Sequence, residues 1–260
     1  MLTGKLICEG RRAENGGTTC HMHTQELVLQ HALGVRRRTR MGKAHDQFPP
    51  GYLLKVKVKK LVRLIMNKHD KNRFKKYVDY CKTFLNIDVR KLVVPNDTRV
   101  SGIFHMFESV LRSYKGLTLY MTGCVDKDKE DFKECLLTQV EWQLMAELHA
   151  VMKWSNMLAM SSQKQSVDSN CFSYYSVAYV RFFVESAKSF KVIEVSNNYN
   201  ASTPVAKIPT MTLLINQLQE DTQLFITRLV KEFNAYFANP DGDQVKMMIL
   251  HPIMAWRGLE

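Results

Sequence analysis

The sequence predicts a mainly α-helical fold with a few short strands. Six long segments repeat their apolar residues every three or four positions, which is the period of a helix with one buried face. Hydrophobic residues make up 45% of the 260 residues, and the sequence has neither a low-complexity tract nor an internal repeat. A chain of this length and composition favours a folded protein with a sizeable core over a disordered one.

The first expected helix begins at the motif Cys20-x-x-His23, because an apolar helical segment follows it directly. The second covers residues 54–65, where one face is apolar and the other carries lysines. The alternation of lysine and valine over residues 55–59 would also suit a strand. The apolar face of this second helix consists of Leu54, Val58, Leu61, Val62 and Ile65.

A third helix is expected over residues 74–85, again with lysines opposite its apolar face. A β-branched run over residues 89–94 ends at Pro95 and predicts an extended segment. A fourth helix is expected over residues 103–115, with Asn96, Asp97 or Thr98 as its cap. The apolar stripe of the third helix is Phe74, Tyr77, Val78, Cys81, Phe84 and Leu85.

Residues 122–134 are polar and charged, and they predict an exposed connection whose carboxylates are solvated. Thr138 and Glu141 have the spacing of a capping box, so a long helix is expected over residues 140–160. The apolar face of this helix includes Met145, Leu148 and Met152.

Two more helices are expected toward the end of the chain. An aromatic stripe predicts one over residues 171–187, and a polar loop over residues 197–209 separates it from the last helix, over residues 210–237. Residues 246–256 are apolar and would suit either a strand or a buried helix. The apolar positions of the last long helix are Leu214, Leu218, Phe225, Leu229, Phe233 and Tyr236.

Positive charge is concentrated in one region of the chain. Residues 36–82 contain 16 lysines and arginines against three aspartates, whereas the whole chain has a net charge of +12. A local surplus of this size indicates a polyanion partner. The alternative is a solvated face that only keeps the protein soluble. A membrane-surface helix is not favoured, because the basic segments lack a face of Trp and Phe.

The cysteines do not predict a metal site. Cys20 and His23 have half the spacing of a zinc finger, but no second pair follows at a ligand distance, so packing at the helix start is favoured. The first residues contain no apolar run of signal-peptide length, and no window reaches the ~18 apolar residues of a membrane span. We therefore expect six reduced thiols in the cytosol or nucleus.

Four short motifs, in their order along the chain, resemble those of hAT-superfamily transposases. They are Cys20-x-x-His23-x-x-x-Leu27, Thr98-Arg99, Glu141-Trp142 and Leu250-His251-Pro252-Ile253-Met254, and the family-motif residues singled out are Cys20, His23 and Thr98. The resemblance implies an RNase H-like (α/β) transposase core that is interrupted by a large helical insertion. In the family, an Asp-Asp-Glu triad binds two Mg²⁺ ions and cuts DNA.

On this resemblance the chain divides into three parts. Residues 1–45 correspond to a remnant of the RNase H-like core that carries the Cys-x-x-His motif. Residues 46–95 form the basic helical segment, and residues 96–260 form the helical insertion region. The fold class expected overall is mainly α, with few short strands.

The sequence departs from the family at the catalytic positions. The first aspartate of the triad would precede residue 1, and residues 1–19 offer only Glu9 and Glu14 for the second. The glutamate would lie on a helix after the His251-Pro252 phrase, and the sequence ends at Glu260. We therefore expect a truncated or degenerate relative that has no catalytic residues of its own, no independent catalysis, and no bound metal or other cofactor.

The expected partner is DNA, bound in the nucleus without membrane contact, and self-association is a further option. The family has tryptophan after Thr98-Arg99, where it stacks on a flipped base, and Val100 has no ring to stack. The alternative function is a nuclear DNA-binding or interaction module that reuses the scaffold. The residues expected to contact phosphates are Arg36, Arg37, Arg38, Lys57, Lys60, Arg63, Lys76 and, by resemblance only, Arg99.

Overall fold

The computed structural model describes residues 12–13, 16–17, 21–36, 48–66, 71–95, 100–123, 131–161, 187–196, 201–204 and 207–237. The helix predicted over residues 171–187 lies almost wholly outside these ranges, as do the predicted caps at 96–98 and the apolar segment 246–256. The predictions for these segments stay predictions.

The fold is mainly helical, as the sequence predicts. Its helices are α2 (His21–Ala32), α3 (Pro49–Ile65), α4 (Lys71–Leu85), α5 (Val100–Arg112), α6 (Tyr114–Gly123), α8 (Gln139–Ser161) and α10 (Glu220–Phe237). The strands β1 (Arg12–Ala13) and β2 (Gly16–Gly17) pair antiparallel, and so do β3 (Ser189–Ile193) and β4 (Thr210–Leu214). Two-stranded sheets are the only sheets among the described residues, so this part of the chain does not contain an RNase H-like sheet.

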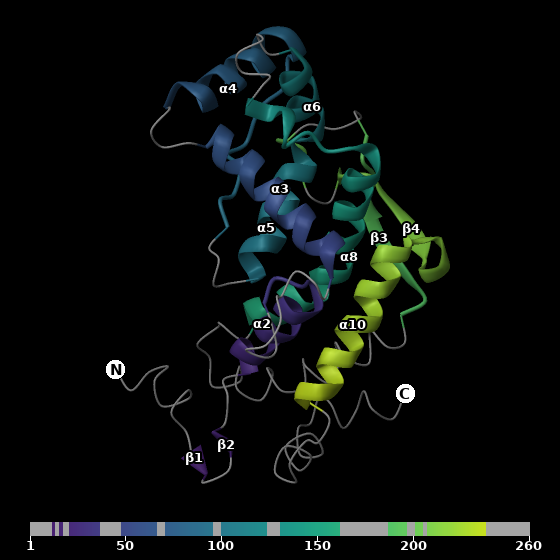
Figure 1. Cartoon of the computed structure of the whole chain (residues 1–260). Helices are drawn as coiled ribbons and strands as arrows, with labels where there is room; N and C mark the ends of the chain where they lie inside the picture. Colours follow the sequence, from purple (N-terminus) through teal and green to yellow (C-terminus); the bar gives the residue numbers. More distant parts are fainter. Residues whose placement is uncertain are drawn as a thin grey trace.

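Helix α8 is the centre of the packing (Figure 1). Helices α5, α2 and α10 and strand β3 all contact it. Helix α3 packs on α5, and α4 packs on both α3 and α6, so α3 and α4 share one hydrophobic core with the later helices. The predicted apolar positions Met145, Leu148 and Met152 of α8 are all buried in that core.

Helix α3 confirms the helical interpretation of the lysine–valine alternation over residues 55–59, and the strand alternative is wrong. Two prolines occupy its first turn, where their missing N–H groups leave no hydrogen bond unmade. All five residues of the predicted apolar stripe are buried, namely Leu54, Val58, Leu61, Val62 and Ile65. Burial of this stripe leaves Lys60 and Arg63 exposed, whereas the other lysines of the helix are partly buried.

The capping box at the start of α8 forms as predicted. The Thr138 N–H donates to Glu141 Oε2 at 2.7 Å, and the Glu141 N–H donates to Thr138 Oγ1 at 3.2 Å. These reciprocal bonds satisfy two donors that the first turn of a helix otherwise leaves open.

A buried carboxylate joins α8 to α10. Glu147 accepts hydrogen bonds from the Gln219 N–H at 2.9 Å, from Thr222 Oγ1 at 2.7 Å and from Gln143 Nε2 at 3.0 Å. Its negative charge lies at the first turn of α10, where the helix dipole stabilises an anion. This glutamate therefore has a structural role.

An arginine joins α10 to α2 in a similar way. Arg228 donates from Nε to the carbonyl of Ala32 and from Nη2 to that of His31, both at 2.9 Å, and its guanidinium lies 5.7 Å from the centre of the Phe48 ring. A cation is favourable at the C-terminal end of a helix. Just after α2 the chain turns at Gly34, whose φ of +71° favours glycine.

Three predictions from apolar periodicity are wrong in detail. The helix predicted over 103–115 is two helices, because α5 ends at Arg112 and α6 starts at Tyr114 and continues to Gly123, inside the predicted loop. The helix predicted over 210–237 begins only at Glu220, since Thr210–Leu214 pairs with β3 as a strand. Phe84, predicted to be buried, is 71% exposed.

None of the described helices combines the length and the apolar composition that crossing a membrane requires.

Candidate nucleic-acid interface

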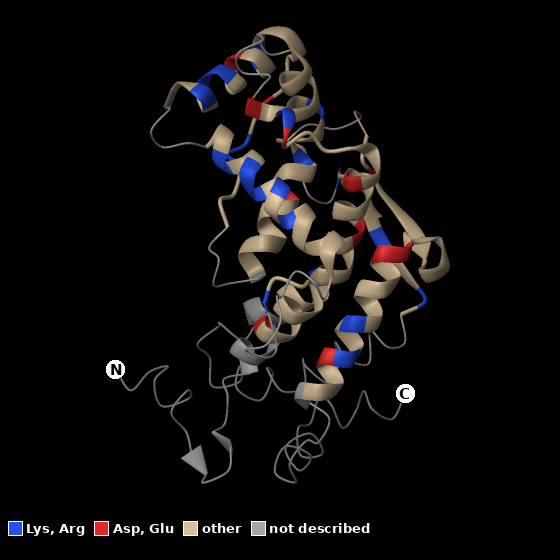
Figure 2. Ribbon diagram, viewed as in Figure 1, with Lys and Arg blue, Asp and Glu red and all other residues tan. Residues whose placement is uncertain are grey.

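Helices α3 and α4, called here the basic helix pair, carry ten lysines and arginines against one aspartate. The two helices contact each other, so their cations lie in one part of the molecule. Figure 2 shows blue segments following one another along both helices. The position of this charge agrees with the charge distribution of the sequence. The individual cations, however, differ from one another in burial and in the groups that they contact.

Lys57 is held in a half-buried ion pair with Glu141, at the start of α8. Its Nζ lies 2.7 Å from both Oε1 and Oε2, and the two side chains are 25% and 28% exposed. Burial by itself raises the pKa of Glu141, but the hydrogen bonds from Lys57 and Thr138 outweigh it, and the net direction is downward. Lys57 thus stabilises a carboxylate that also caps α8.

Two more cations of the basic helix pair bind carboxylates of the same segment, residues 131–141, which we call the acidic segment. Lys60 donates to Glu134, and Arg73 Nη2 lies 2.6 Å from Asp131 Oδ2. The hydrogen bond with Lys60 lowers the pKa of Glu134, and the same bond raises the pKa of Lys60.

Buried side chains hold the acidic segment in place beside the basic helix pair. Phe132 and Cys135 are fully buried, and the Phe132 ring contacts Tyr120 of α6 at 5.9 Å between ring centres. The Arg73 guanidinium lies 5.8 Å from the centre of the Phe132 ring. The carboxylates therefore belong to a packed segment. The prediction from the sequence, that they are merely solvated, is wrong.

The remaining predicted phosphate contacts are only partly described. Arg63 and Lys76 are exposed on the basic helix pair, and Arg36 is exposed just after α2. His23 lies in α2, but its side chain is outside the described part of the structure. The other predicted residues lie outside the described ranges, namely Cys20, Arg37, Arg38, Thr98 and Arg99.

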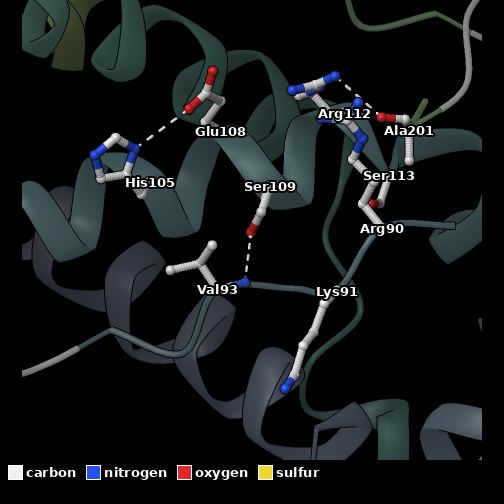
Figure 3. Close-up of a pocket in the computed structure, with 9 residues that line it drawn as sticks. All are labelled: Arg90, Lys91, Val93, His105, Glu108, Ser109, Arg112, Ser113 and Ala201. Atoms are coloured by element: carbon white, nitrogen blue, oxygen red, sulfur yellow. Dashed lines mark hydrogen bonds and ion pairs between the residues drawn. The ribbon is translucent and has the colours of Figure 1, made fainter. Parts of the chain in front are cut away.

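A pocket of about 250 Å³ lies beside α5 (Figure 3). One wall is the segment 90–93, the second is one face of α5 with Ser113, and the third is Ala201. The Val93 N–H donates to Ser109 Oγ at 3.1 Å, and this hydroxyl donates to the Met106 carbonyl at 2.9 Å. These bonds fasten the first wall to α5.

The third wall of the pocket is fastened by an arginine. Arg112 Nη2 donates to the carbonyls of Ala201 at 3.1 Å and of Thr203 at 2.6 Å. Hydrogen bonds thereby hold three separate chain segments around one space, so the pocket is formed without a ligand.

The lining of the pocket has more positive than negative charge. Arg90, Lys91 and Arg112 line it together with one carboxylate, Glu108. His105 Nδ1 lies 3.4 Å from Glu108 Oε2, and this contact lowers the pKa of Glu108 against the opposing effect of burial. Within the described ranges, neither Arg90 nor Lys91 makes an ion pair.

Sequence reasoning missed this pocket. The one available signal was the spacing of His105, Glu108 and Arg112, which places three polar side chains on one face of a helix whose other face is apolar. Nothing in the sequence brings Arg90 or Ala201 to that face, because these contacts depend on the tertiary fold.

Behind the pocket wall, His149 of α8 is buried and stacks on Phe104 of α5, with ring centres 4.3 Å apart. Burial lowers its pKa to about 4. Its Nε2 has no hydrogen-bond partner among the described residues. The imidazole is therefore neutral at physiological pH and acts as an aromatic ring of the core.

Within the described ranges, no group of three or more His, Cys, Asp or Glu side chains is placed to hold a metal ion. The carboxylates described above bind cations or cap helices.

Comparisons of the chain with models of protein families, with curated proteins and with solved structures gave no match. The resemblance to hAT transposases therefore depends on the four sequence motifs alone.

Proposed function

We propose that this chain is a nucleic-acid-binding scaffold related to hAT-superfamily transposases, which binds duplex DNA in the nucleus and does not cut it. The observation that carries the proposal is the concentration of ten cations on two helices that pack together and bury their apolar faces. A surface of this kind binds phosphates with little preference for base sequence. The order of the family motifs supports the relation to transposases.

The cations of the basic helix pair do not contribute equally to this function. Lys57 is half-buried against Glu141, so we assign it to the fold. Lys60, Arg63, Lys75 and Lys76 are exposed, and we assign them to phosphate contacts. Phosphates have to compete with Glu134 for Lys60 and with Asp131 for Arg73, so the acidic segment lowers the affinity for DNA.

The test is the salt dependence of duplex binding, followed by fluorescence anisotropy. A quadruple variant with Lys60→Gln, Arg63→Gln, Lys75→Gln and Lys76→Gln removes the proposed phosphate-binding side chains and leaves Lys57 in place. The plot of log affinity against log salt should flatten by roughly one unit for each phosphate that the variant no longer neutralises.

A matched control removes the same number of exposed charges elsewhere, with Lys188→Gln, Lys191→Gln, Lys207→Gln and Lys231→Gln. The control should keep most of the wild-type slope. The proposal fails if the wild type does not bind duplex DNA at ~50 mM salt. It also fails if the two quadruple variants flatten the slope equally.

One observation favours the alternative, an interaction module with a protein partner or a second copy of the chain. Apolar side chains are exposed next to the Lys57–Glu141 ion pair: Leu53 is 61% exposed, Val140 is 66% exposed, and Val56 is also exposed. Exposed apolar groups beside charged ones are common at protein interfaces. Sedimentation that depends on protein concentration, together with no duplex binding, would favour this alternative.

A further inference from the structure

The pocket beside α5 has the features of an anion site. It is preformed, since the Val93–Ser109 and Arg112–Ala201 hydrogen bonds hold its walls. A preformed site binds more tightly, because the protein does not have to be ordered when the ligand arrives. The site depends on none of the ion pairs of the basic helix pair, so it can be tested independently of the proposed function.

Its charge selects the class of ligand. Three cationic side chains and one carboxylate line the pocket. Glu108 is balanced locally, because it contacts His105 and the positive charge of Arg112 acts on it in the same direction. Arg112 is engaged with the carbonyls of the third wall and contributes mainly its charge. Arg90 and Lys91 are exposed and can turn toward a ligand.

The volume of about 250 Å³ sets the size of the ligand. Pockets for drug-sized molecules have volumes of ~300–1,000 Å³, so this one suits a smaller group. A phosphate with the sugar attached to it is of that size. Arginine is well matched to phosphate, because its planar group can donate two parallel hydrogen bonds to two phosphate oxygens.

We propose that this pocket binds the phosphate group of a phosphoester, with Arg90 and Lys91 as its direct ligands. The same chemistry is found in a free mononucleotide and in the terminal phosphate of a DNA strand. The second source would add a strand-end contact to the duplex contacts of the basic helix pair. Only that second source rests on the proposed function.

Isothermal titration calorimetry with inorganic phosphate and with deoxyadenosine monophosphate tests the proposal on the full chain. The double variant Arg90→Gln with Lys91→Gln should weaken binding by roughly tenfold or more, since it removes two charge-assisted hydrogen-bond donors. The double variant Lys188→Gln with Lys191→Gln removes the same charge from exposed positions outside the lining and should change affinity by less than about twofold.

Glu108→Gln keeps the shape of the lining and removes its one negative charge. This variant should bind phosphate several-fold more tightly, a gain that misfolding cannot produce. The proposal is overturned if neither phosphate nor the mononucleotide binds, or if the Arg90 and Lys91 double variant binds both as well as the wild type does.

Two oligonucleotides that differ only in a terminal phosphate distinguish the two sources. Tighter binding of the phosphorylated strand, abolished in the Arg90 and Lys91 double variant, supports the proposal and assigns the site to strand ends. Equal binding of both strands, with mononucleotide binding sensitive to the double variant, supports it and assigns the site to free phosphoesters. Failure of duplex binding by the basic helix pair would leave the mononucleotide result unchanged, so the two proposals can fail separately.

Discussion

The basic helix pair and the pocket beside α5 are both rich in cations, but they present them differently. In the basic helix pair, Lys57, Lys60 and Arg73 bind carboxylates of the acidic segment. In the pocket, Arg90 and Lys91 belong to a lining with a single carboxylate, which His105 already contacts. The basic helix pair has more cations, whereas Arg90 and Lys91 of the pocket make no ion pair among the described residues.

The difference shows that the number of cations in a sequence overstates the charge that a partner meets. Glu141 is 84 residues from Lys57 in the chain, yet the fold brings its carboxylate to 2.7 Å. The half-buried pair stabilises the fold, whereas the exposed pair of Lys60 with Glu134 can open at little cost when a phosphate arrives. Three perturbations test this comparison.

The largest expected effect concerns His149, which lies behind the pocket wall. Its pKa is about 4 in the folded chain against 6.5 as the ordinary value, so the unfolded chain binds the proton more readily. Stability should therefore fall as pH drops from 6.5 toward 4, by about 3 kcal/mol between pH 7 and pH 4. The variant His149→Phe keeps a ring against Phe104 but cannot bind this proton. Its loss of stability between pH 7 and pH 4 should therefore be smaller by that amount.

Urea unfolding of both proteins at pH 7 and pH 4 measures the effect. The wild type is compared with His149→Phe at each pH, so that the carboxylates titrating in both proteins cancel. An identical pH dependence in the two proteins would contradict the buried, neutral state of His149. That outcome would also weaken the description of α5 as a rigid wall of the pocket.

A smaller effect distinguishes the ion pairs within the basic helix pair. Lys57→Gln should lower the free energy of unfolding by about 1–2 kcal/mol, because it leaves a half-buried Glu141 without its cation. Lys60→Gln, three residues further along the same helix, should leave the free energy of unfolding almost unchanged, because its pair is exposed to solvent. Chemical unfolding at neutral pH compares the two variants. Equal losses in the free energy of unfolding would show that burial does not make the Lys57 pair more stabilising than the Lys60 pair.

The sequence predicted the elements in which one apolar face is clear. The stripe from Leu54 to Ile65 and the capping box of Thr138 and Glu141 are local signals, and the structure confirms both. The sequence predicts helix for Thr210–Leu214, because Leu214 continues the apolar period of the last helix. Pairing with β3 decides its conformation, and that partner is distant in the sequence.

The candidate site was less predictable than the fold. Lysines and arginines can be counted in a sequence, but their partners cannot, since Glu134 and Asp131 lie 74 and 58 residues from Lys60 and Arg73. The acidic segment looked like a solvated loop because charge dominates its composition. Burial of Phe132 and Cys135 anchors it instead, and an isolated aromatic residue in a charged stretch is too weak a pattern to predict this.

We propose that cations of the basic helix pair bind DNA phosphates and that the acidic segment competes for these cations. Duplex affinity of the double variant Asp131→Asn with Glu134→Gln tests it most directly, at ~0.1 M salt where screening limits effects to about 10 Å. Glu194→Gln with Glu220→Gln is the control, since it removes two carboxylates from outside the acidic segment. We expect the first variant to bind duplex DNA several-fold more tightly than the wild type and the control to bind with unchanged affinity. Affinity that is unchanged or weaker in the first variant, or that rises equally in the control, would contradict it.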